Sequence, residues 1–185
     1  MLQKNEIRLL ILEPSLSEKA QIRCVQKKVS LDDDPTYEAL SYAWGDPTPV
    51  NDILLDGRSF KVTLSAWDAL KALRHKISPR VLWIDAICIN QTDLAERSEQ
   101  VKLMGAIYKK ASSVRVWLGP DDDGDKDAIP ILKTMLSVTG AKDITLGLDT
   151  GSRDRISQLQ RFFARSWWER LWVVQEVALG QKVAL

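Results

Sequence analysis

The stretch VLWIDAICINQ, residues 81–91, decides the fold class because it joins an apolar run to a series of polar side chains. Residues 81–84 are apolar on both faces of an extended chain, which is typical of a strand that helices cover on both sides. Asp85 stands at the carboxyl end of that run. Two further apolar runs, Tyr37–Ala43 and Val114–Leu118, each end near a glycine. We therefore expect three buried strands in one sheet.

Helical patterns alternate with these strands. Ser65 can begin one helix, with Asp68 as its capping-box partner, and Thr92 can cap the next. A stripe at helical spacing follows Thr92, and the strand Val114–Leu118 comes after it. Such alternation predicts an α/β domain with a central parallel sheet between two helical layers, a flavodoxin-like three-layer sandwich.

Further elements extend this core. Ile7–Leu12 and Gln21–Val29 read as two more strands. The segments Ile53–Leu55 and Ser59–Val62 flank Asp56-Gly57, a pair that supplies the positive φ angles of a type I′ turn, so they predict an added β-hairpin. Ile129–Val138 and Ile156–Phe163 are expected to be helical.

The last helix is expected to run from Ser166, with Glu169 as capping partner, to Gly180. At this spacing Trp168, Trp172 and Glu176 share one face of the helix. A neighbouring apolar face should pack on the sheet, and it consists of Trp167, Leu171, Val174 and Ala178. Glu176 should then lie at the boundary between core and solvent.

In open parallel sheets, ligands bind outside the carboxyl ends of the strands. Three segments should arrive there: residues 41–45, 85–91 and 118–120. The first two are rich in hydrogen-bonding side chains. A carboxylate beside indole rings, such as Glu176 near Trp172, can bind a flat cationic or aromatic ligand.

Simpler interpretations compete with each of these. Glu176 on a helix is more often a solvated surface acid. Asp85 could equally serve as a turn former. The tryptophans are more often core than ligand cage, since large aromatics dominate core energetics.

Composition limits the function classes. The 185 residues include 26 basic and 25 acidic side chains, for a net charge of +1, which argues against a dedicated nucleic-acid surface. The two cysteines form no Cys-x-x-Cys pair, as is typical of a reducing compartment. No apolar run approaches the roughly 20 residues that cross a bilayer. We expect a cytoplasmic protein that binds neither membrane nor nucleic acid.

Motifs for metals and phosphates are missing from the sequence. Asp121–Asp127 begins like a calcium loop, but Lys126 and Leu132 stand at the required glycine and glutamate positions. One histidine and two distant cysteines offer no zinc site. There is no phosphate-binding P-loop and no nucleophile elbow. We therefore expect no metal and no bound cofactor.

Three blocks together resemble the heterokaryon incompatibility (HET) domain of fungal proteins. They are YEALSYAWG at 37–45, LWIDAICINQ at 82–91 and RLWVVQE at 170–176. The resemblance covers about residues 7 to 180 and implies a HET domain over 1–185, with a core of about 37–180. Members usually carry this domain at the start of a longer chain, so we expect these residues to be an N-terminal part.

HET domains are similar to TIR domains, and the resemblance implies a TIR-like fold. Trp172 to Glu176 looks like the TIR Trp-x-x-x-Glu signature, whose glutamate supports NAD⁺ cleavage in enzymatic TIR domains. It implies Glu176 as catalytic residue and NAD⁺ as substrate. The implied substrate-binding residues are Ser41, Tyr42, Trp44, Gly45, Asp85, Asn90, Gln91, Arg97 and Trp172. The hairpin and the region around Arg97 depart from a minimal TIR domain.

The leading interpretation is therefore a cell-death effector of allorecognition that hydrolyses NAD⁺ when it forms a homo-oligomer, triggered by an incompatibility partner protein. Nicotinamide leaves as a neutral base, so one carboxylate could suffice where ordinary glycosidases need two. One alternative is a non-enzymatic TIR-like module that only self-associates. Another is a phosphoacceptor receiver with Asp85, but the segment after Tyr37–Ala43 offers Asp46 alone where a receiver needs an acidic pair.

Overall fold

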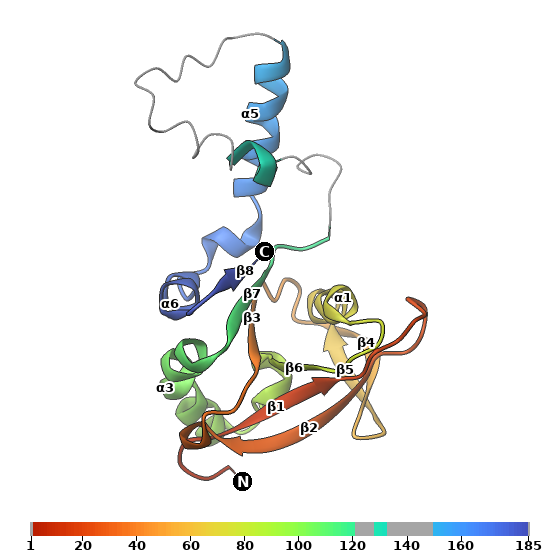
Figure 1. Ribbon diagram of the computed structural model, residues 1–185, viewed down its shortest axis with the longest axis vertical. Helices are drawn as coiled ribbons and strands as arrows, with labels where there is room; N and C mark the ends of the chain where they lie inside the picture. Colours follow the sequence, from red (N-terminus) through yellow and green to blue (C-terminus); the bar gives the residue numbers. More distant parts are fainter. Residues whose placement is uncertain (1, 121–127, 133–149, 185) are drawn as a thin grey trace. The chain divides into compact units, whose positions relative to one another are not determined.

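The computed structural model describes residues 2–120, 128–132 and 150–184 (Figure 1). The chain divides into two compact units. Unit 1 comprises Met1–Gly119 and Arg170–Leu185, and unit 2 comprises Pro120–Glu169. The segment Asp121–Asp127, which the sequence rules out as a calcium loop, lies outside the described residues.

Unit 1 is built on a sheet of eight described strands in the order β5-β4-β2-β1-β6-β3-β7-β8. Their bounds are β1 Glu6–Leu12, β2 Arg23–Ser30, β3 Glu38–Tyr42, β4 Pro49–Leu55, β5 Arg58–Thr63, β6 Arg80–Trp83, β7 Ser113–Trp117 and β8 Val183–Ala184.

The three strands predicted to form the parallel core are confirmed as β3, β6 and β7. Ala39 of β3 pairs in parallel with Trp83 on one side and with Val114 on the other. All three residues are fully buried. The second strand, β6, lies inside the sheet rather than at an edge. The carboxyl ends of the three strands therefore meet on one side of the sheet.

The rest of the sheet is mixed, and here the expected flavodoxin-like, TIR-like topology is not confirmed. β1 is antiparallel to both β2 and β6, while β2 is parallel to β4. Only β6, β3, β7 and β8 form a continuous parallel block. The apolar runs of the sequence predict burial of a strand but carry no information on its direction, so β1 and β2 could be predicted as strands and not placed.

The hairpin of β4 and β5 is confirmed. Leu55 pairs with Arg58 across a two-residue loop. Asp56 and Gly57 both have positive φ, 51° and 76°, as a type I′ turn requires.

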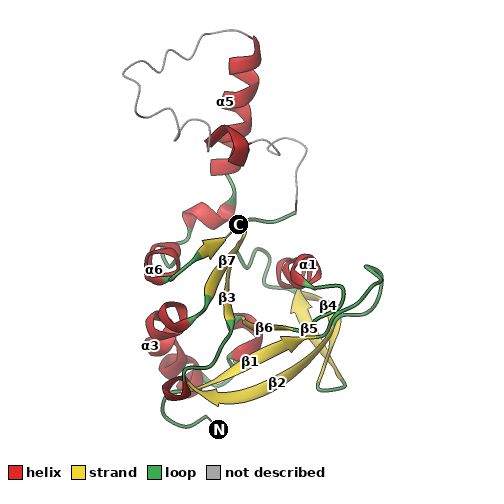
Figure 2. Cartoon of the chain, viewed as in Figure 1, coloured by secondary structure: helices red, strands yellow, loops and turns green. Residues whose placement is uncertain are grey.

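The helices of unit 1 are α1 Leu64–Leu73, α2 Asp85–Cys88, α3 Leu94–Lys110 and α6 Val173–Leu179, with a short 3₁₀ turn η1 at Leu31–Asp33. Figure 2 shows α3 and α6 side by side along β3 and β7, with α1 across from them. Among the described residues, no helix has the length and apolar character to cross a membrane.

Both predicted helix caps of unit 1 are wrong by one or two residues. Thr63 caps α1 by accepting from Ala66 N, and Asp93 caps α3 by accepting from Ala95 N and Glu96 N. The expected cap Ser65 instead donates to Ala43 O at 2.5 Å. Neighbouring Ser, Thr and Asp residues have similar capping ability, so the tertiary context decides among them.

Unit 2 contains α5 Thr150–Phe163, which includes the predicted helix Ile156–Phe163, and the 3₁₀ turn η2 Ser166–Glu169. Residues 128–132 are helical, and the rest of the predicted helix Ile129–Val138 lies outside the described residues. An aromatic cluster packs this unit, with ring centroids 4.8 to 5.5 Å apart; it consists of Phe162, Phe163, Trp167 and Trp168.

The prediction of one last helix from Ser166 to Gly180 is wrong. Residues 166–169 form η2, and α6 begins at Val173 after a non-helical break. Of the predicted core face, Trp167 is buried, but Leu171 is 84% and Val174 70% accessible, whereas Glu176 is fully buried. The break rotates the face that the helical spacing assigns, so the carboxylate points inward and the apolar residues point outward.

Candidate functional site

The carboxyl end of β3 supplies the first site residues. Ser41 and Tyr42, the last two residues of the strand, are both buried. The chain then turns at Gly45, whose φ of 64° suits glycine. Trp44 lies half-exposed in this turn, and the bond from Ser65 to the carbonyl of Ala43 ties the turn to the start of α1.

Glu176 reaches the same place from α6. Its carboxylate accepts a hydrogen bond from the Ser41 hydroxyl. Arg170 donates to it through both terminal nitrogens, with Nη2 2.9 Å from Oε1 and Nη1 3.2 Å from Oε2. The Glu176 side chain is 1% exposed and that of Arg170 is 21% exposed. A buried carboxylate is tolerated only when it is paired and hydrogen-bonded, and Ser41 and Arg170 together meet that need.

Close packing of the following turn fixes α6 against the sheet. A Cβ added to Gly180 would lie 2.7 Å from Cγ2 of Val114, so only a glycine lets the chain pass β7 this closely. Two residues later, the carbonyl of Lys182 accepts from Val114 N at 2.7 Å and starts the pairing of β8. This contact sets the position of Glu176, one turn earlier, relative to the end of β3.

Asp85 supplies a second carboxylate, directly after β6. Its Oδ2 accepts from the indole Nε1 of Trp44 at 2.9 Å, and its Oδ1 accepts from Ala86 N at 2.7 Å. Burial raises the pKa of Asp85 to about 6, although these two hydrogen bonds oppose the rise. The charge of Arg170 lowers the same pKa and that of Glu176 raises it. Asp85 therefore shares an electrostatic environment with the Glu176 cluster.

Tyr42 belongs to this environment as well. Burial raises the pKa of its hydroxyl well above the usual value, and the negative charge of Asp85 raises it further. The phenol is therefore neutral at physiological pH and offers a proton for hydrogen bonding.

The segment after Asp85 is held by polar anchors. Gln91 Nε2 donates to the carbonyl of Asp85 at 2.8 Å. Asn90 N donates to Glu96 Oε1 at 2.7 Å. Arg8 donates to both carboxylate oxygens of Glu96, at 2.5 and 2.9 Å. Asn90 and Gln91 thus position this loop, although the side chain of Asn90 is itself exposed.

Two predicted site residues stand apart from the cluster. Arg97 is exposed on α3 and takes part in none of the cluster's hydrogen bonds given above. Trp172 is 49% exposed and immediately precedes α6, where its carbonyl accepts from Glu176 N at 3.0 Å. The sequence placed Trp172 and Glu176 on one face of the last helix, but Trp172 is exposed and Glu176 is buried in the structure.

Arg170 is a site residue that the sequence pattern did not indicate. Six positions separate it from Glu176, a spacing that places no two residues on one helical face. It contacts Glu176 because residues 170–172 are not helical. The only sequence feature that points to Arg170 is its place as the first residue of the block RLWVVQE, and that place does not show which side chain it binds.

A matched cluster occupies the opposite end of the same strands. Glu38, the first residue of β3, accepts from Arg80 of β6, from Arg115 Nε at 2.7 Å and from Ser113 Oγ at 2.9 Å, both in β7. Burial alone would raise the pKa of Glu38, but these hydrogen bonds outweigh it and lower the pKa to about 2.

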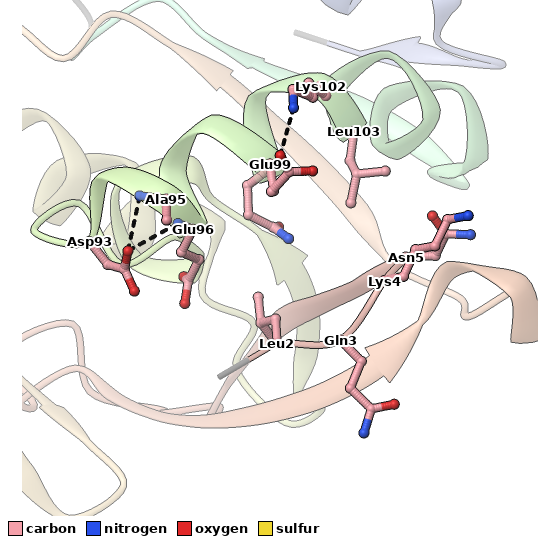
Figure 3. Close-up of a pocket in the computed structure, with 11 residues that line it drawn as sticks. Leu2, Gln3, Lys4, Asn5, Asp93, Ala95, Glu96, Glu99, Lys102 and Leu103 are labelled. Carbon is pink, nitrogen blue, oxygen red and sulfur yellow. Dashed lines mark hydrogen bonds and ion pairs between the residues drawn. The ribbon is translucent and has the colours of Figure 1, made fainter.

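A cavity of about 530 Å³ lies elsewhere, between the N-terminal segment and the start of α3 (Figure 3). Leu2 and Leu103 line it together with charged side chains such as Glu99 and Lys102, which pair with each other at 2.6 Å. None of the predicted site residues lines this cavity.

The arrangement at the carboxyl ends brings together a buried carboxylate, a second carboxylate with a raised pKa, an arginine and an indole. A carboxylate whose burial raises its pKa, as in Asp85, is a candidate for acid–base chemistry. A negative charge held in a low-dielectric setting stabilises a developing cation more strongly than the same charge in water.

Comparisons with known proteins agree with the blocks in the sequence. The family model described as "Heterokaryon incompatibility protein (HET)" matches residues 37–176. The heterokaryon incompatibility protein 6, OR allele, of Neurospora crassa is 33% identical over 215 residues. That alignment covers 94% of this chain, and the chain spans about a third (32%) of the length of that relative. No solved structure matches the chain.

Proposed function

Since the chain belongs to the heterokaryon incompatibility (HET) family, we propose that it is a cell-death effector domain that cleaves NAD⁺ to nicotinamide and ADP-ribose when it oligomerises. The observation that supports this most is the buried carboxylate of Glu176 at the carboxyl end of β3, bonded to Ser41 and Arg170 and near Asp85.

The reaction breaks the bond between the pyridinium nitrogen and C1′ of the ribose. The electron pair stays on nitrogen, so neutral nicotinamide leaves and a cation develops on the ribose. Water adds at C1′ and releases one proton. Glu176 stabilises the cation through its charge, and no group has to protonate the leaving base, in contrast to ordinary glycosidases.

Asp85 and its neighbours complete the site in this proposal. With a pKa of about 6, Asp85 is mostly ionised at neutral pH and accepts the proton of the attacking water. The indole of Trp44, which is half-exposed and bonded to Asp85, offers a face for the flat cationic pyridinium. Tyr42 and Gly45 border the same turn, and Asn90 and Gln91 hold the loop after Asp85.

Oligomerisation is part of the proposal because Glu176 is fully buried in the structure. A constitutive NAD⁺ hydrolase would also harm its host, so the open state has to be rare until a trigger such as an incompatibility partner stabilises it. If the open state is populated at ~1%, about 2.7 kcal/mol of contact energy makes it equal to the resting one. A modest interface between copies supplies that amount.

The experiment is NAD⁺ consumption against protein concentration, with and without an artificial dimeriser fused to the chain. We expect specific activity to rise steeply with concentration and with dimerisation, and Glu176→Ala to remain inactive throughout. An active enzyme with a flat response would contradict the oligomerisation step. Equal rates for wild type and Glu176→Ala would contradict the assignment of Glu176.

A second candidate function is a non-enzymatic module that signals by self-association. The observation that favours it is that Glu176 is buried and paired with both Arg170 and Ser41. A buried carboxylate with such partners also fits a structural role. A cell-death assay separates the two functions. If Glu176→Ala kills cells as wild type does, and no NAD⁺ is consumed under any clustering, the module is the better account.

A further inference from the structure

Arg170 occupies the place on Glu176 that a cationic ligand needs. The guanidinium is a flat cation, and it donates to both oxygens of the carboxylate at 2.9 and 3.2 Å. The hydroxyl of Ser41, at the end of β3, donates to the same carboxylate. With Glu176 1% exposed, no second cation can approach its charge while Arg170 stays in place.

We propose that Arg170 is an autoinhibitory plug, a proposal that rests on the proposed function of Glu176. The guanidinium of Arg170 takes the place of the substrate's cation in the resting state and withdraws when the protein clusters. The side chain keeps 21% of its surface exposed, more than the carboxylate it covers, so it has a route toward solvent. Once it leaves, the charge of Glu176 is free for the developing ribose cation.

The place of Arg170 in the chain suits a switch. It belongs to neither helix nor strand, and it is the first residue of the second segment of unit 1. The residue before it, Glu169, ends η2 and is the last residue of unit 2. Arg170 is therefore joined to the last residue of unit 2 by a single peptide bond.

The first test compares NAD⁺ cleavage by Arg170→Ala, Arg170→Lys and wild type without a dimeriser. If the plug is withdrawn in ~1% of wild-type molecules, the open fraction used above, its removal raises the rate by up to about a hundredfold, and lysine, which lacks the two-pronged fork, gives a smaller rise. Ethylguanidinium at millimolar concentration should inhibit Arg170→Ala again and leave wild type unaffected. Arg80→Ala is the matched control, because it breaks an arginine–glutamate pair at the opposite end of β3 and should show no rise.

The second test does not depend on activity. A water-soluble carbodiimide with an amine labels accessible carboxylates, and mass spectrometry of peptides reads the labelling of Glu176. We expect Glu176 to be protected in unclustered wild type and labelled in clustered wild type and in both Arg170 variants. Glu38 should stay protected in all of them, which shows that the chain remains folded, and exposed Glu99 should always react.

The outcomes separate the plug from the proposed reaction. A fall in activity for Arg170→Lys and Arg170→Ala, restored by ethylguanidinium, would overturn the plug and make Arg170 a positioning residue. If no variant cleaves NAD⁺ but clustering exposes Glu176, the plug stands and NAD⁺ is the wrong substrate. If Glu176 stays protected in clustered wild type, the plug is refuted whether or not NAD⁺ is cleaved.

Discussion

Two glutamates mark the two ends of the same parallel strands, and they have the same kinds of partner. Glu38 at the amino end binds Arg80, Arg115 and a serine hydroxyl. Glu176 at the carboxyl end binds Arg170 and a serine hydroxyl. Their surroundings differ, because every partner of Glu38 sits on a strand of the sheet, whereas Arg170 sits in a break between η2 and α6.

The difference shows which ion pair can open. The backbones of Arg80 and Arg115 are fixed by the pairing of β6 and β7, so we expect the Glu38 cluster to stay closed while the sheet is intact. Arg170 has no such constraint from backbone pairing within a strand or helix, and we propose that it leaves Glu176 while the sheet stays intact. Local opening of this kind is characteristic of functional segments.

The largest expected effect comes from Glu176→Gln, which keeps the size of the side chain and removes its charge. We expect NAD⁺ cleavage by the clustered protein to fall about 10²–10³-fold, as when a main electrostatic stabiliser of a transition state is lost. The measurement is the initial rate of nicotinamide release. A loss of activity of less than a few-fold would mean that Glu176, like Glu38, has no part in catalysis.

Glu38→Gln should act on stability instead, lowering the free energy of unfolding by about 2 kcal/mol at pH 7. The folded pKa of about 2 is below the unfolded value of roughly 4.3. The stabilisation by the Glu38 charge is therefore complete above the unfolded pKa. It is lost as pH falls through the folded pKa. Urea unfolding at pH 7 and pH 3 checks this, with the difference between variant and wild type shrinking at low pH. A difference that is independent of pH would contradict the charge-based explanation.

Asp85→Asn is expected to stabilise the chain, by about 1 kcal/mol at pH 7.5. Here the folded pKa of about 6 is above the unfolded value of roughly 3.9, so wild type loses stability as pH rises between them. The gain should vanish at pH 4, where the folded carboxyl is protonated. Thermal unfolding at both pH values measures it. If Asp85→Asn instead destabilises the chain at pH 7.5, the ionised carboxylate of Asp85 stabilises the fold, as that of Glu38 does.

Trp44→Phe should give the smallest effect. It removes the indole donor that opposes the effect of burial on Asp85, so the pKa of Asp85 should rise further. The acidic limb of the pH–rate profile of NAD⁺ cleavage should move upward, by about half a unit to one unit. An unchanged limb, with activity retained, would mean that Asp85 does not titrate in the reaction.

Several parts of this account could be predicted from the sequence for clear physical reasons. Apolar runs identified β3, β6 and β7, and Asp56-Gly57 identified the hairpin turn. Ser41, Trp44, Asp85 and Glu176 were expected at the carboxyl ends of those strands, and the hydrogen bonds between Ser41 and Glu176 and between Trp44 and Asp85 join them there in two pairs.

Other parts depend on long-range contacts that a local pattern does not contain. The antiparallel placement of β1 between β2 and β6 is set by pairing partners far apart in the chain. Helical spacing across residues 166–180 predicted a continuous helix, yet burying Glu176 with Arg170 requires the break at residues 170–172. The contact between Arg170 and Glu176 follows from that break and was therefore not predictable.

The most direct test of the central claim is nicotinamide release by the dimerised protein, measured in parallel for wild type, Glu176→Gln and Glu38→Gln at equal folded concentration. We predict that Glu38→Gln retains the wild-type rate within about twofold, since the two sites are independent, and that Glu176→Gln loses it. Equal rates for the two variants, or no release by dimerised wild type, would contradict the claim that the carboxyl end of these strands is the catalytic one.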